Sequence, residues 1–340
     1  MMKKVKVAVL GATGFTGEKL VELLLNHPLA EINYLTSKNF EPTSYSDIFP
    51  RFKNKINIKC EQFDIKRAIK RADIFFLALP HTVSMQIAPL LLKKKKKVID
   101  LSADYRLKNV SIYKKFYKYT HKDRRNLKRA VYGLPEFFKD KIKKTNLVAN
   151  PGCYPTSIIL GLAPLLKSRK INTKIIIDAK STITGAGRKA LVDYHFSNIN
   201  NNIWGYKPFI HQHLGEIIQI LKDISGLHCK ITFMPHVVGV ESGIYSTCYV
   251  SFKKLTTFSS IFNLYKRYYK DCPFVRVYKV LPKLKDVIGT NFCDIGFGLS
   301  KDKKEAVVVS CLDNLIKGAS GTAIQNMNIM CGFKEKEGLI

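Results

Sequence analysis

A cysteine in the segment Asn-Pro-Gly-Cys-Tyr-Pro-Thr, residues 150–156, has the surroundings of a nucleophile. Apolar residues before the segment suit the end of a buried strand, and the apolar pattern over residues 157–166 suits a helix. Pro155 falls in the first helical turn, where proline is tolerated best. Cys153 is therefore expected at or just before a helix N-terminus, where N–H groups and the helix dipole stabilise a thiolate. A buried structural cysteine is the alternative.

Two histidines and a glutamate supply a candidate acid and base for that thiol. His213 and Glu216 stand three residues apart at the start of a predicted helix over residues 213–224, so they share one face. We predict His213 as the acid/base, oriented by Glu216, with His211 as the other candidate. The paired histidines could also bind a metal, but no third ligand has suitable local spacing, so no metal is expected.

A glycine-rich turn, Gly-Ala-Thr-Gly-Phe-Thr-Gly at residues 11–17, follows a predicted strand over residues 5–10 and opens a predicted helix over residues 15–26. This arrangement is a variant of the dinucleotide fingerprint, in which glycines let a pyrophosphate approach the helix N-terminus. The turn therefore predicts a dinucleotide cofactor. The residues expected to contact it are Gly11, Thr13, Gly14, Phe15, Thr16 and Gly17.

The end of the second predicted strand bears on which nucleotide binds. A site specific for NAD usually has an acidic residue there, which binds the ribose 2′-hydroxyl. Here the strand is followed by Ser37 and Lys38, a hydroxyl and a cation that suit a 2′-phosphate. The prediction is NADP, with an ordinary polar turn as the alternative interpretation.

A second glycine-rich segment, residues 181–189, ends in two cations. Its small residues offer backbone N–H groups, and such groups beside cations suit a phosphate or a carboxylate. A mobile glycine loop is the alternative. The residues expected to bind substrate are Ser181, Gly187, Arg188 and Lys189.

Composition and charge exclude several classes of function. The 57 basic and 26 acidic residues give a net charge of +31, but lysines are spread along the whole chain without an aromatic-interleaved stripe, so no nucleic-acid partner is expected. No apolar run approaches the roughly 20 residues that span a bilayer, so no membrane partner is expected either. The eight cysteines lack paired spacing, which favours a reducing compartment and a cytoplasmic location.

Together these motifs resemble the N-acetyl-gamma-glutamyl-phosphate reductase family, in the aspartate-semialdehyde dehydrogenase-like group. The resemblance covers nearly the whole chain, and NPGCYPT and the C-terminal motif are its most specific parts. The motifs are GATGFTG at 11–17, ALPH at 78–81, DLSADYR at 100–106, YGLPE at 132–136, NPGCYPT at 150–156, TGAGRK at 184–189, HQH…EI at 211–217, GTNFCDIGF at 289–297 and GASGTAIQNMN at 318–328.

The resemblance implies an α/β fold with a Rossmann-type parallel-sheet domain, residues 1–150 and 313–340, to which the C-terminal helix returns. An α+β catalytic and dimerisation domain with a mixed sheet is expected over residues 151–312. Strand and helix signals alternate before residue 102 and change after residue 153, which agrees with this division. Residues 102–146 lack periodicity and are expected to form a covering loop.

The resemblance also implies the reaction. NADPH-dependent reduction of N-acetyl-L-glutamyl 5-phosphate to the 5-semialdehyde, with release of phosphate, would proceed through a thioester on Cys153. Asn314 looks like a contact on the nicotinamide side, and a homo-oligomer, dimer or tetramer, is usual. Pro80, Ser102 and Gly185 lie in the family motifs and are expected to contact the cofactor as well.

Two departures and two alternatives stay open. The family commonly has arginines where Gln212 and Ser242 stand here, so substrate contacts differ unless Arg188 and Lys189 supply them. A relative that reduces aspartyl phosphate, or aminoadipyl phosphate on a carrier protein, is the alternative enzyme. A catalytically silent dinucleotide-binding sensor is the alternative of another class, and the intact Cys153 argues against it.

Overall fold

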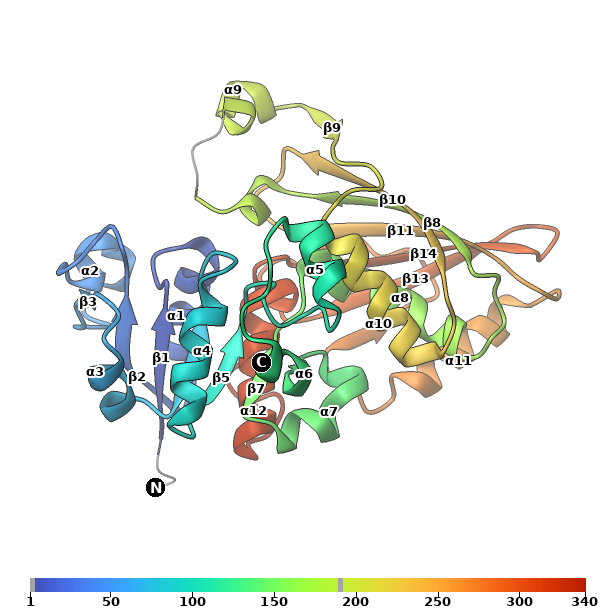
Figure 1. The fold of residues 1–340 in the computed structure, drawn as a ribbon. Helices are drawn as coiled ribbons and strands as arrows, with labels where there is room; N and C mark the ends of the chain where they lie inside the picture. The colour runs from blue at the N-terminus through green and yellow to red at the C-terminus, as the bar shows by residue number, and fades with distance from the viewer. Residues whose placement is uncertain (1–3, 189–191) are drawn as a thin grey trace. The chain divides into compact units, whose positions relative to one another are not determined.

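The structure is a computed structural model that describes residues 4–188 and 192–340 (Figure 1). Contacts divide the chain into two units: the first ends at Pro151 and regains the segment Ala319–Ile340, and the second is Gly152–Gly318. Residues 313–318 thus group with the second unit, whereas the sequence prediction assigns them to the first. The nucleophile candidate is the second residue of the second unit.

The first unit contains a parallel sheet, as predicted for a Rossmann-type domain. The strand order is β3-β2-β1-β4-β5-β7-β6, and each neighbouring pair is parallel. Parallel strands place their carboxyl ends at one edge, where ligands of such sheets bind. The strands are β1 (Val5–Leu10), β2 (Ala30–Thr36), β3 (Cys60–Glu61), β4 (Ile74–Leu77), β5 (Lys97–Asp100), β6 (Val131–Tyr132) and β7 (Leu147–Ala149).

The C-terminal helix α12 (Gly321–Cys331) packs in the first unit, as the resemblance implies. Ala323, Ile324 and Met327 are fully buried in one core cluster with strand residues Val7 and Val9. This helix, red in Figure 1, contacts α7 and the strand β5. The other helices of the unit are α1 (Phe15–Leu25), α2 (Tyr45–Ile48), α3 (Ile65–Arg71), α4 (Ser84–Lys93), α5 (Val110–Tyr117), α6 (Arg124–Arg129) and α7 (Pro135–Lys144).

The expectation of an irregular covering loop over residues 102–146 is wrong. The segment holds α5, α6, β6 and α7. Local caps define two of these helices, because the side chain of Asn109 accepts hydrogen bonds at the start of α5 and that of Asp123 accepts one at the start of α6. These helices are short and rich in lysine, and each buries only one or two of its residues.

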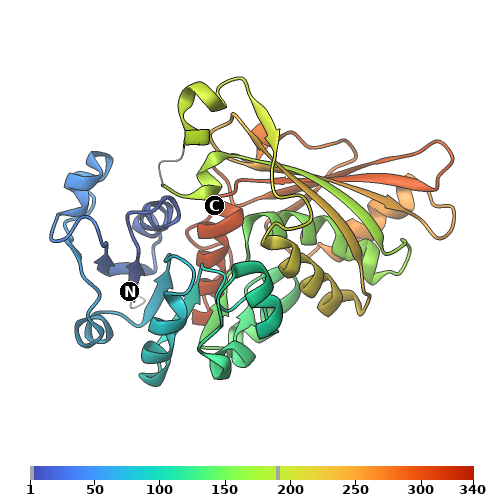
Figure 2. The same ribbon diagram turned by 45° about the horizontal axis from the view of Figure 1, so that its top comes forward.

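The second unit contains a mixed sheet with strand order β12-β13-β14-β11-β8-β10-β9. Figures 1 and 2 show α8, α10 and α11 on one face of this sheet, as an α+β domain requires. The strands are β8 (Lys174–Ser181), β9 (Ile203–Gly205), β10 (Lys230–Val238), β11 (Ile244–Ser251), β12 (Val275–Val277), β13 (Cys293–Leu299) and β14 (Glu305–Leu312). The helices are α8 (Cys153–Lys167), α9 (Phe196–Ile199), α10 (His213–Ser225) and α11 (Phe258–Tyr268).

Buried hydroxyl groups fix the position of α8 on the sheet. Pro164 has no N–H for the carbonyl of Leu160, and the Tyr269 hydroxyl donates to that carbonyl at 2.5 Å instead. Nearer the start of the helix, the Ser157 hydroxyl lies 2.8 Å from the Ser310 hydroxyl on β14. These contacts leave α8, and therefore its first residue, little freedom to slide along the sheet.

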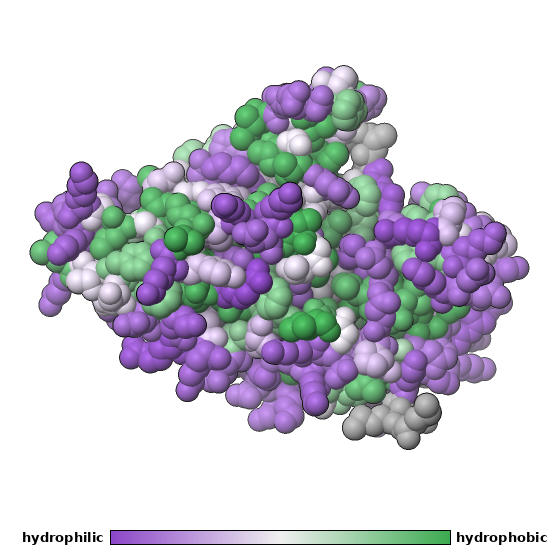
Figure 3. Space-filling model, turned by 180° about the vertical axis from the view of Figure 1, so that it is seen from behind, coloured by the Kyte–Doolittle hydropathy of each residue, from purple (hydrophilic) through white to green (hydrophobic). Residues whose placement is uncertain are grey.

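Exposed apolar side chains gather on the surface of the second unit, among the residues that the structure describes. Val192, Phe196 and Ile203 are 74%, 79% and 56% exposed. They belong to the short segment with α9 and β9, where the space-filling view in Figure 3 shows apolar side chains gathered. Among the described helices, none has the length and apolar composition that a membrane crossing needs.

Candidate active site

Cys153 is the first residue of α8, as predicted. Gly152 is the N-cap, with extended backbone angles (φ −72°, ψ 154°), and its N–H donates to Oε1 of Glu216 at 2.9 Å. The cysteine is half-buried, whereas the next thirteen helix residues are buried. A thiol at this position faces the positive end of the helix dipole and the N–H groups of the first turn, which favour the thiolate.

The residues just before the cysteine are held within the first unit. The Arg106 Nε donates to the carbonyl oxygen of Asn150 at 2.7 Å. The Asn150 amide donates to the carbonyl of Ala319 at 3.0 Å and accepts from Asn326 at 3.1 Å. Arg106 is the last residue of the DLSADYR motif, and the sequence alone predicts no role for it. Its burial beside this segment shows that it fixes the chain that leads to Cys153.

The two histidines lie together at the start of α10. The His213 backbone N–H donates to Nδ1 of His211 at 3.1 Å, and the two ring centroids are 4.9 Å apart. Burial, and secondly the charge of Lys207, lower the pKa of His211 to about 4. His211 is therefore neutral near pH 7, with its proton on Nε2, because Nδ1 accepts a hydrogen bond. That nitrogen lies 3.4 Å from the Tyr206 hydroxyl.

Two tyrosines near the thiol were missed by sequence reasoning. The Tyr154 hydroxyl donates to the carbonyl of His236 at 3.2 Å, and the Tyr206 hydroxyl donates to that of Tyr154 at 3.4 Å. Burial first raises the pKa of both phenols, and the charge of Cys153 adds to the shift in each. Both hydroxyls therefore stay protonated beside the thiol. Tyr154 could have been found as the neighbour of Cys153, but nothing in the sequence singles out Tyr206.

The glycine turn after β1 has the geometry of a phosphate cradle. Gly11 has φ +82°, and a Cβ there would lie 2.3 Å from the carbonyl oxygen of Ala78. A Cβ on Gly17 would lie 2.2 Å from the carbonyl oxygen of Gly11, so helix and turn need glycine at both positions. Gly14 is the N-cap of α1, and a Cβ there would meet nothing nearer than 3.8 Å. Thr13, Phe15 and Thr16 complete the turn, whose N–H groups and open side fit a pyrophosphate.

The end of β2 meets this turn, as the prediction for the nucleotide requires. The hydroxyls of Thr13 and Ser37 are 2.8 Å apart, and the Gly11 N–H donates to the Thr36 hydroxyl at 3.1 Å. Ser37 is buried and Lys38 is exposed. A hydroxyl and a cation thus stand at the place where an NAD site carries an acid.

Pro80 and Ser102 lie in the loops after β4 and β5, at the same carboxyl edge of the sheet. The Ser102 hydroxyl donates to Asp100 at 3.0 Å. Burial, and secondly the nearby Asp104, raise the pKa of Asp100 to about 6. Asp104 in turn accepts from the N–H groups of Thr82 and Met85, at 2.8 Å and 2.9 Å. These contacts hold both loops in place at the carboxyl edge of the sheet, where the glycine turn also lies.

In the second unit, Asn314 connects two loops. Its Oδ1 accepts from the Gly243 N–H at 2.6 Å, and its Nδ2 donates to the Thr184 hydroxyl at 2.9 Å. The amide thus positions the glycine-rich segment predicted to bind substrate. Within that segment Ser181 is buried at the end of β8, and Gly185, Gly187 and Arg188 are exposed. Lys189 lies outside the described residues.

Asn291, in the GTNFCDIGF motif, is a further candidate that sequence reasoning did not single out. It is 2% exposed, and neither polar atom of its carboxamide has a partner among the described residues. It stands between Gly289, whose N–H donates to Asp313 at 3.0 Å, and Cys293, which pairs with Leu312. A buried carboxamide without partners is costly, so it indicates a contact with a bound molecule or a water.

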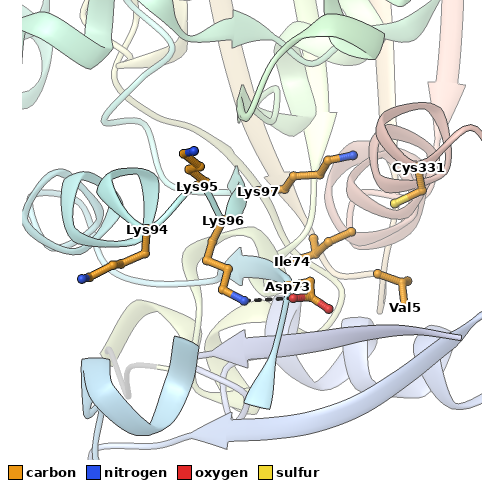
Figure 4. A pocket seen from close by; sticks show the side chains of 8 residues that line it. All are labelled: Val5, Asp73, Ile74, Lys94, Lys95, Lys96, Lys97 and Cys331. Atoms are coloured by element: carbon orange, nitrogen blue, oxygen red, sulfur yellow. Dashed lines mark hydrogen bonds and ion pairs between the residues drawn. The ribbon is translucent and has the colours of Figure 1, made fainter. Parts of the chain in front are cut away.

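A separate pocket in the first unit, about 300 Å³ in volume, is lined by none of the candidate catalytic or cofactor-binding residues. It is lined at the amino ends of the strands by Val5 and Ile74, opposite the glycine turn. Figure 4 shows the ion pair of Lys96 with Asp73, which are 2.9 Å apart, beside three further lysines. These lysines follow the C-terminus of α4, where cations balance the helix dipole.

Two family models match the chain. The one described as semialdehyde dehydrogenase, NAD binding domain, matches residues 6–145, and the one described as semialdehyde dehydrogenase, dimerisation domain, matches residues 153–314. The chain is 45% identical to an N-acetyl-gamma-glutamyl-phosphate reductase of Desulfotalea psychrophila, with 98% of each chain covered. It is 44% identical to one of Pelotomaculum thermopropionicum, with 98% of this chain and 97% of the relative covered.

Solved structures share the fold at low sequence identity. Aspartate semialdehyde dehydrogenase II from Vibrio cholerae superposes with a TM-score of 0.74 at 17% identity, covering 97% of this chain and 99% of that chain. Aspartate semialdehyde dehydrogenase from Candida albicans, solved with NADP, superposes with a TM-score of 0.68 at 17% identity, with the same coverage. These likenesses confirm the fold class.

Proposed function

Because the chain belongs to the semialdehyde dehydrogenase family, and within it to the N-acetyl-gamma-glutamyl-phosphate reductases, we propose that it reduces N-acetyl-L-glutamyl 5-phosphate to N-acetyl-L-glutamate 5-semialdehyde and phosphate, a step of arginine biosynthesis. The observation that carries this proposal is Cys153 at the first position of α8, with the preceding N–H held by Glu216. A reactive thiol is of use to an acyl-phosphate reductase and not to a dinucleotide-binding sensor.

Cys153 is the proposed nucleophile. Its thiolate sulfur attacks the acyl carbon, a carbon–sulfur bond forms, and the bond from that carbon to the phosphate oxygen breaks to release phosphate. The thioester accepts hydride and becomes a thiohemiacetal. The carbon–sulfur bond then breaks, the aldehyde leaves, and the thiolate is regenerated. The N–H groups at the start of α8 stabilise the negative sulfur before attack and after collapse.

His213 is the proposed acid/base, which protonates the developing oxyanion and later removes that proton. Its neighbour His211 is a weaker candidate, because its lowered pKa of about 4 leaves it little tendency to carry a proton near pH 7. His211 instead accepts the backbone N–H of His213 and fixes the start of α10. The contact of Glu216 with Gly152 gives this carboxylate a role in placing the nucleophile.

The cofactor is a nicotinamide dinucleotide, since the first unit matches an NAD-binding domain of this family, and NADP is the proposed form. When bound, it supplies the hydride. Gly11, Gly14 and Gly17 leave room for the pyrophosphate at the start of α1, and Ser37 with Lys38 would bind the 2′-phosphate. Among the residues expected to contact it further along the chain are Pro80, Ser102, Gly185 and Asn314.

Substrate binding is proposed for the segment 181–189, through Ser181, Gly187, Arg188 and Lys189. The exposed Arg188 supports this assignment, because a guanidinium binds phosphate or carboxylate oxygens in pairs. A homo-oligomer is proposed from the match to a dimerisation domain. Reduction of aspartyl phosphate, or of a carrier-bound aminoadipyl phosphate, is the alternative that the related fold leaves open.

One assay separates these substrates. The purified protein would be given NADP, phosphate and either N-acetylglutamate semialdehyde or aspartate semialdehyde, and formation of the reduced cofactor would be followed by absorbance. We expect phosphate-dependent oxidation of the N-acetylated substrate at a rate at least tenfold that of the other. Faster oxidation of aspartate semialdehyde would contradict the proposed substrate and favour the alternative.

A further inference from the structure

We propose that Gly318 positions the Cys153 thiol. A Cβ built on Gly318 would lie 2.9 Å from the Cβ of Cys153, closer than real Cβ atoms approach their neighbours. The glycine comes from the C-terminal motif GASGTAIQNMN and touches the first residue of α8, 165 positions earlier in the chain. The inference rests on the proposed function only for its kinetic readout.

The turn that carries Gly318 cannot readily move away from the cysteine. Residues Ile316–Ser320 form one π-helical turn, and the Gly318 N–H donates to the carbonyl of Asp313 at 2.9 Å. The Asp313 carboxylate accepts from the N–H groups of Leu315 and Ile316, at 2.8 Å and 3.0 Å. Single π-helical turns of this kind are frequent at functional sites.

Lys317, the residue before the glycine, anchors the same turn. Its side chain is fully buried, and its ammonium lies 5.5 Å from the ring centroid of Phe274. A lysine stem packed in the core resists rotation of the turn, because rotation would expose the stem or move the charge away from the ring face. Gly318 therefore lies on a backbone that is held from both sides.

The cysteine side of the contact is equally restricted. Gly152 is held by Glu216 at 2.9 Å, and Ser157, one turn into α8, bonds to the sheet. The added methyl group would also meet the carbonyl oxygen of Asp313 at 3.3 Å and Cδ1 of Leu312 at 3.2 Å. Leucine can rotate, but the carbonyl cannot, so the methyl group is driven toward Cys153. Glycine at 318 thus sets where the sulfur lies relative to the acyl carbon.

A small displacement of a nucleophile has a large kinetic effect, because about 1 Å of misplacement can cost about 100-fold in rate. We therefore expect Gly318→Ala to lower kcat by roughly 10- to 100-fold while the KM for the cofactor changes little. Alkylation of Cys153 by iodoacetamide, followed by mass spectrometry of the peptide, should also change in rate by several fold. That readout needs neither substrate nor cofactor.

Two control variants separate positioning from packing strain. Gly298→Ala, on β13, adds a methyl group that meets nothing within 4 Å and should match the unsubstituted protein in both readouts. Gly161→Ala, two turns further along α8, adds a methyl group 3.2 Å from the Ser310 hydroxyl. It should lower the melting temperature without a selective change in the alkylation rate of Cys153.

A double substitution tests the contact itself. Cys153→Gly removes the Cβ that the new methyl group would strike, so Gly318→Ala should lower the melting temperature less in that background than in the natural one. The same comparison serves if Gly318→Ala alone does not fold, since the double variant should then recover. Equal losses in the two backgrounds, or a folded Gly318→Ala protein with unchanged kcat and alkylation rate, would overturn the proposal. If no variant reduces acyl phosphates but alkylation changes as expected, the proposed function fails and the positioning role stands.

Discussion

Glu216 on α10 accepts the backbone N–H of Gly152 at 2.9 Å, so a buried carboxylate fixes the residue that directly precedes the proposed nucleophile, Cys153. The sequence places Glu216 beside His213 and predicts that it orients that ring. Its hydrogen bond with Gly152 links two segments that are 64 residues apart in the chain. It joins the helix with the proposed acid/base to the N-terminus of the helix with the thiol.

Replacement of Glu216 should therefore affect the backbone at Gly152, directly before Cys153. In Glu216→Ala the Gly152 N–H loses its acceptor, and an unsatisfied buried donor costs about 1–3 kcal/mol. Glu216→Gln keeps an oxygen that can accept the bond, so its melting temperature should lie nearer that of the unsubstituted protein. We expect kcat to fall more in the alanine variant than in the glutamine variant. Equal effects of the two substitutions on stability would show that the acceptor for Gly152 is not what Glu216 supplies.

Cys153→Ser tests the thioester. The hydroxyl is a much weaker nucleophile at neutral pH, so activity should fall to a few per cent or less while the fold is kept. Alkylation of Cys153 should abolish activity. Bound phosphate or substrate should slow the alkylation, because it covers the thiol. Cys248→Ser is a matched control, because that thiol is fully buried on β11 and burial raises its pKa to about 12. Substantial activity in Cys153→Ser would exclude a covalent sulfur intermediate.

The buried His211 should make the fold sensitive to acid. Its pKa is about 4 in the folded chain and about 6.5 when unfolded, so the unfolded chain binds the proton first as pH falls. The contribution of His211 to the free energy of unfolding is intact above about pH 6.5. It falls between about pH 6.5 and pH 4, by roughly 3 kcal/mol at most. His211→Asn, which can still accept the His213 N–H, should lose less stability over that range. His228→Asn, at an exposed histidine, should behave as the unsubstituted protein does; denaturant unfolding at several pH values measures all three.

The local parts of the site could be predicted because each depends on a few adjacent residues. A strand, a glycine turn and a helix start identify Gly11 to Gly17, and the proline–glycine pair identifies Cys153 as the start of α8. Side-chain partners far apart in the chain could not be predicted. Neither the contact of Glu216 with Gly152 nor the approach of Gly318 to Cys153 leaves a periodic signal in the sequence.

Among the helices and strands, too, some could be predicted from the sequence and others could not. The long segments α12 and β11 were predicted. In β11 buried residues alternate with less buried ones, whereas α12 is buried on all sides from Gly321 to Met330. The helices α5, α6 and α7 were missed, since they are short and rich in lysine and each buries only one or two of its residues.

The cofactor prediction can be tested at Ser37. Its hydroxyl lies beside that of Thr13, and Lys38 is exposed next to it, so a 2′-phosphate would gain charge-assisted hydrogen bonds of about 1.5–3 kcal/mol each. NADPH should therefore be preferred over NADH by at least about tenfold in kcat/KM. Ser37→Asp should reduce or reverse that preference, because a carboxylate repels the phosphate and accepts the ribose hydroxyls. Equal kcat/KM for the two cofactors in the natural enzyme would show that Ser37 and Lys38 do not recognise the 2′-phosphate.

Asn291 offers a test in which stability and activity should move apart. Its carboxamide is buried with neither polar atom partnered among the described residues, so Asn291→Leu removes an uncompensated desolvation cost at similar volume. We expect an equal or higher melting temperature. If the carboxamide binds the acyl portion of the substrate, kcat/KM for the N-acetylated substrate should fall by about tenfold or more through KM, since a hydrogen bond is lost on binding. Asn291→Asp, which keeps an acceptor but adds a buried charge, should lose both stability and activity. A leucine variant that is less stable and fully active would assign Asn291 to the internal structure of the second unit.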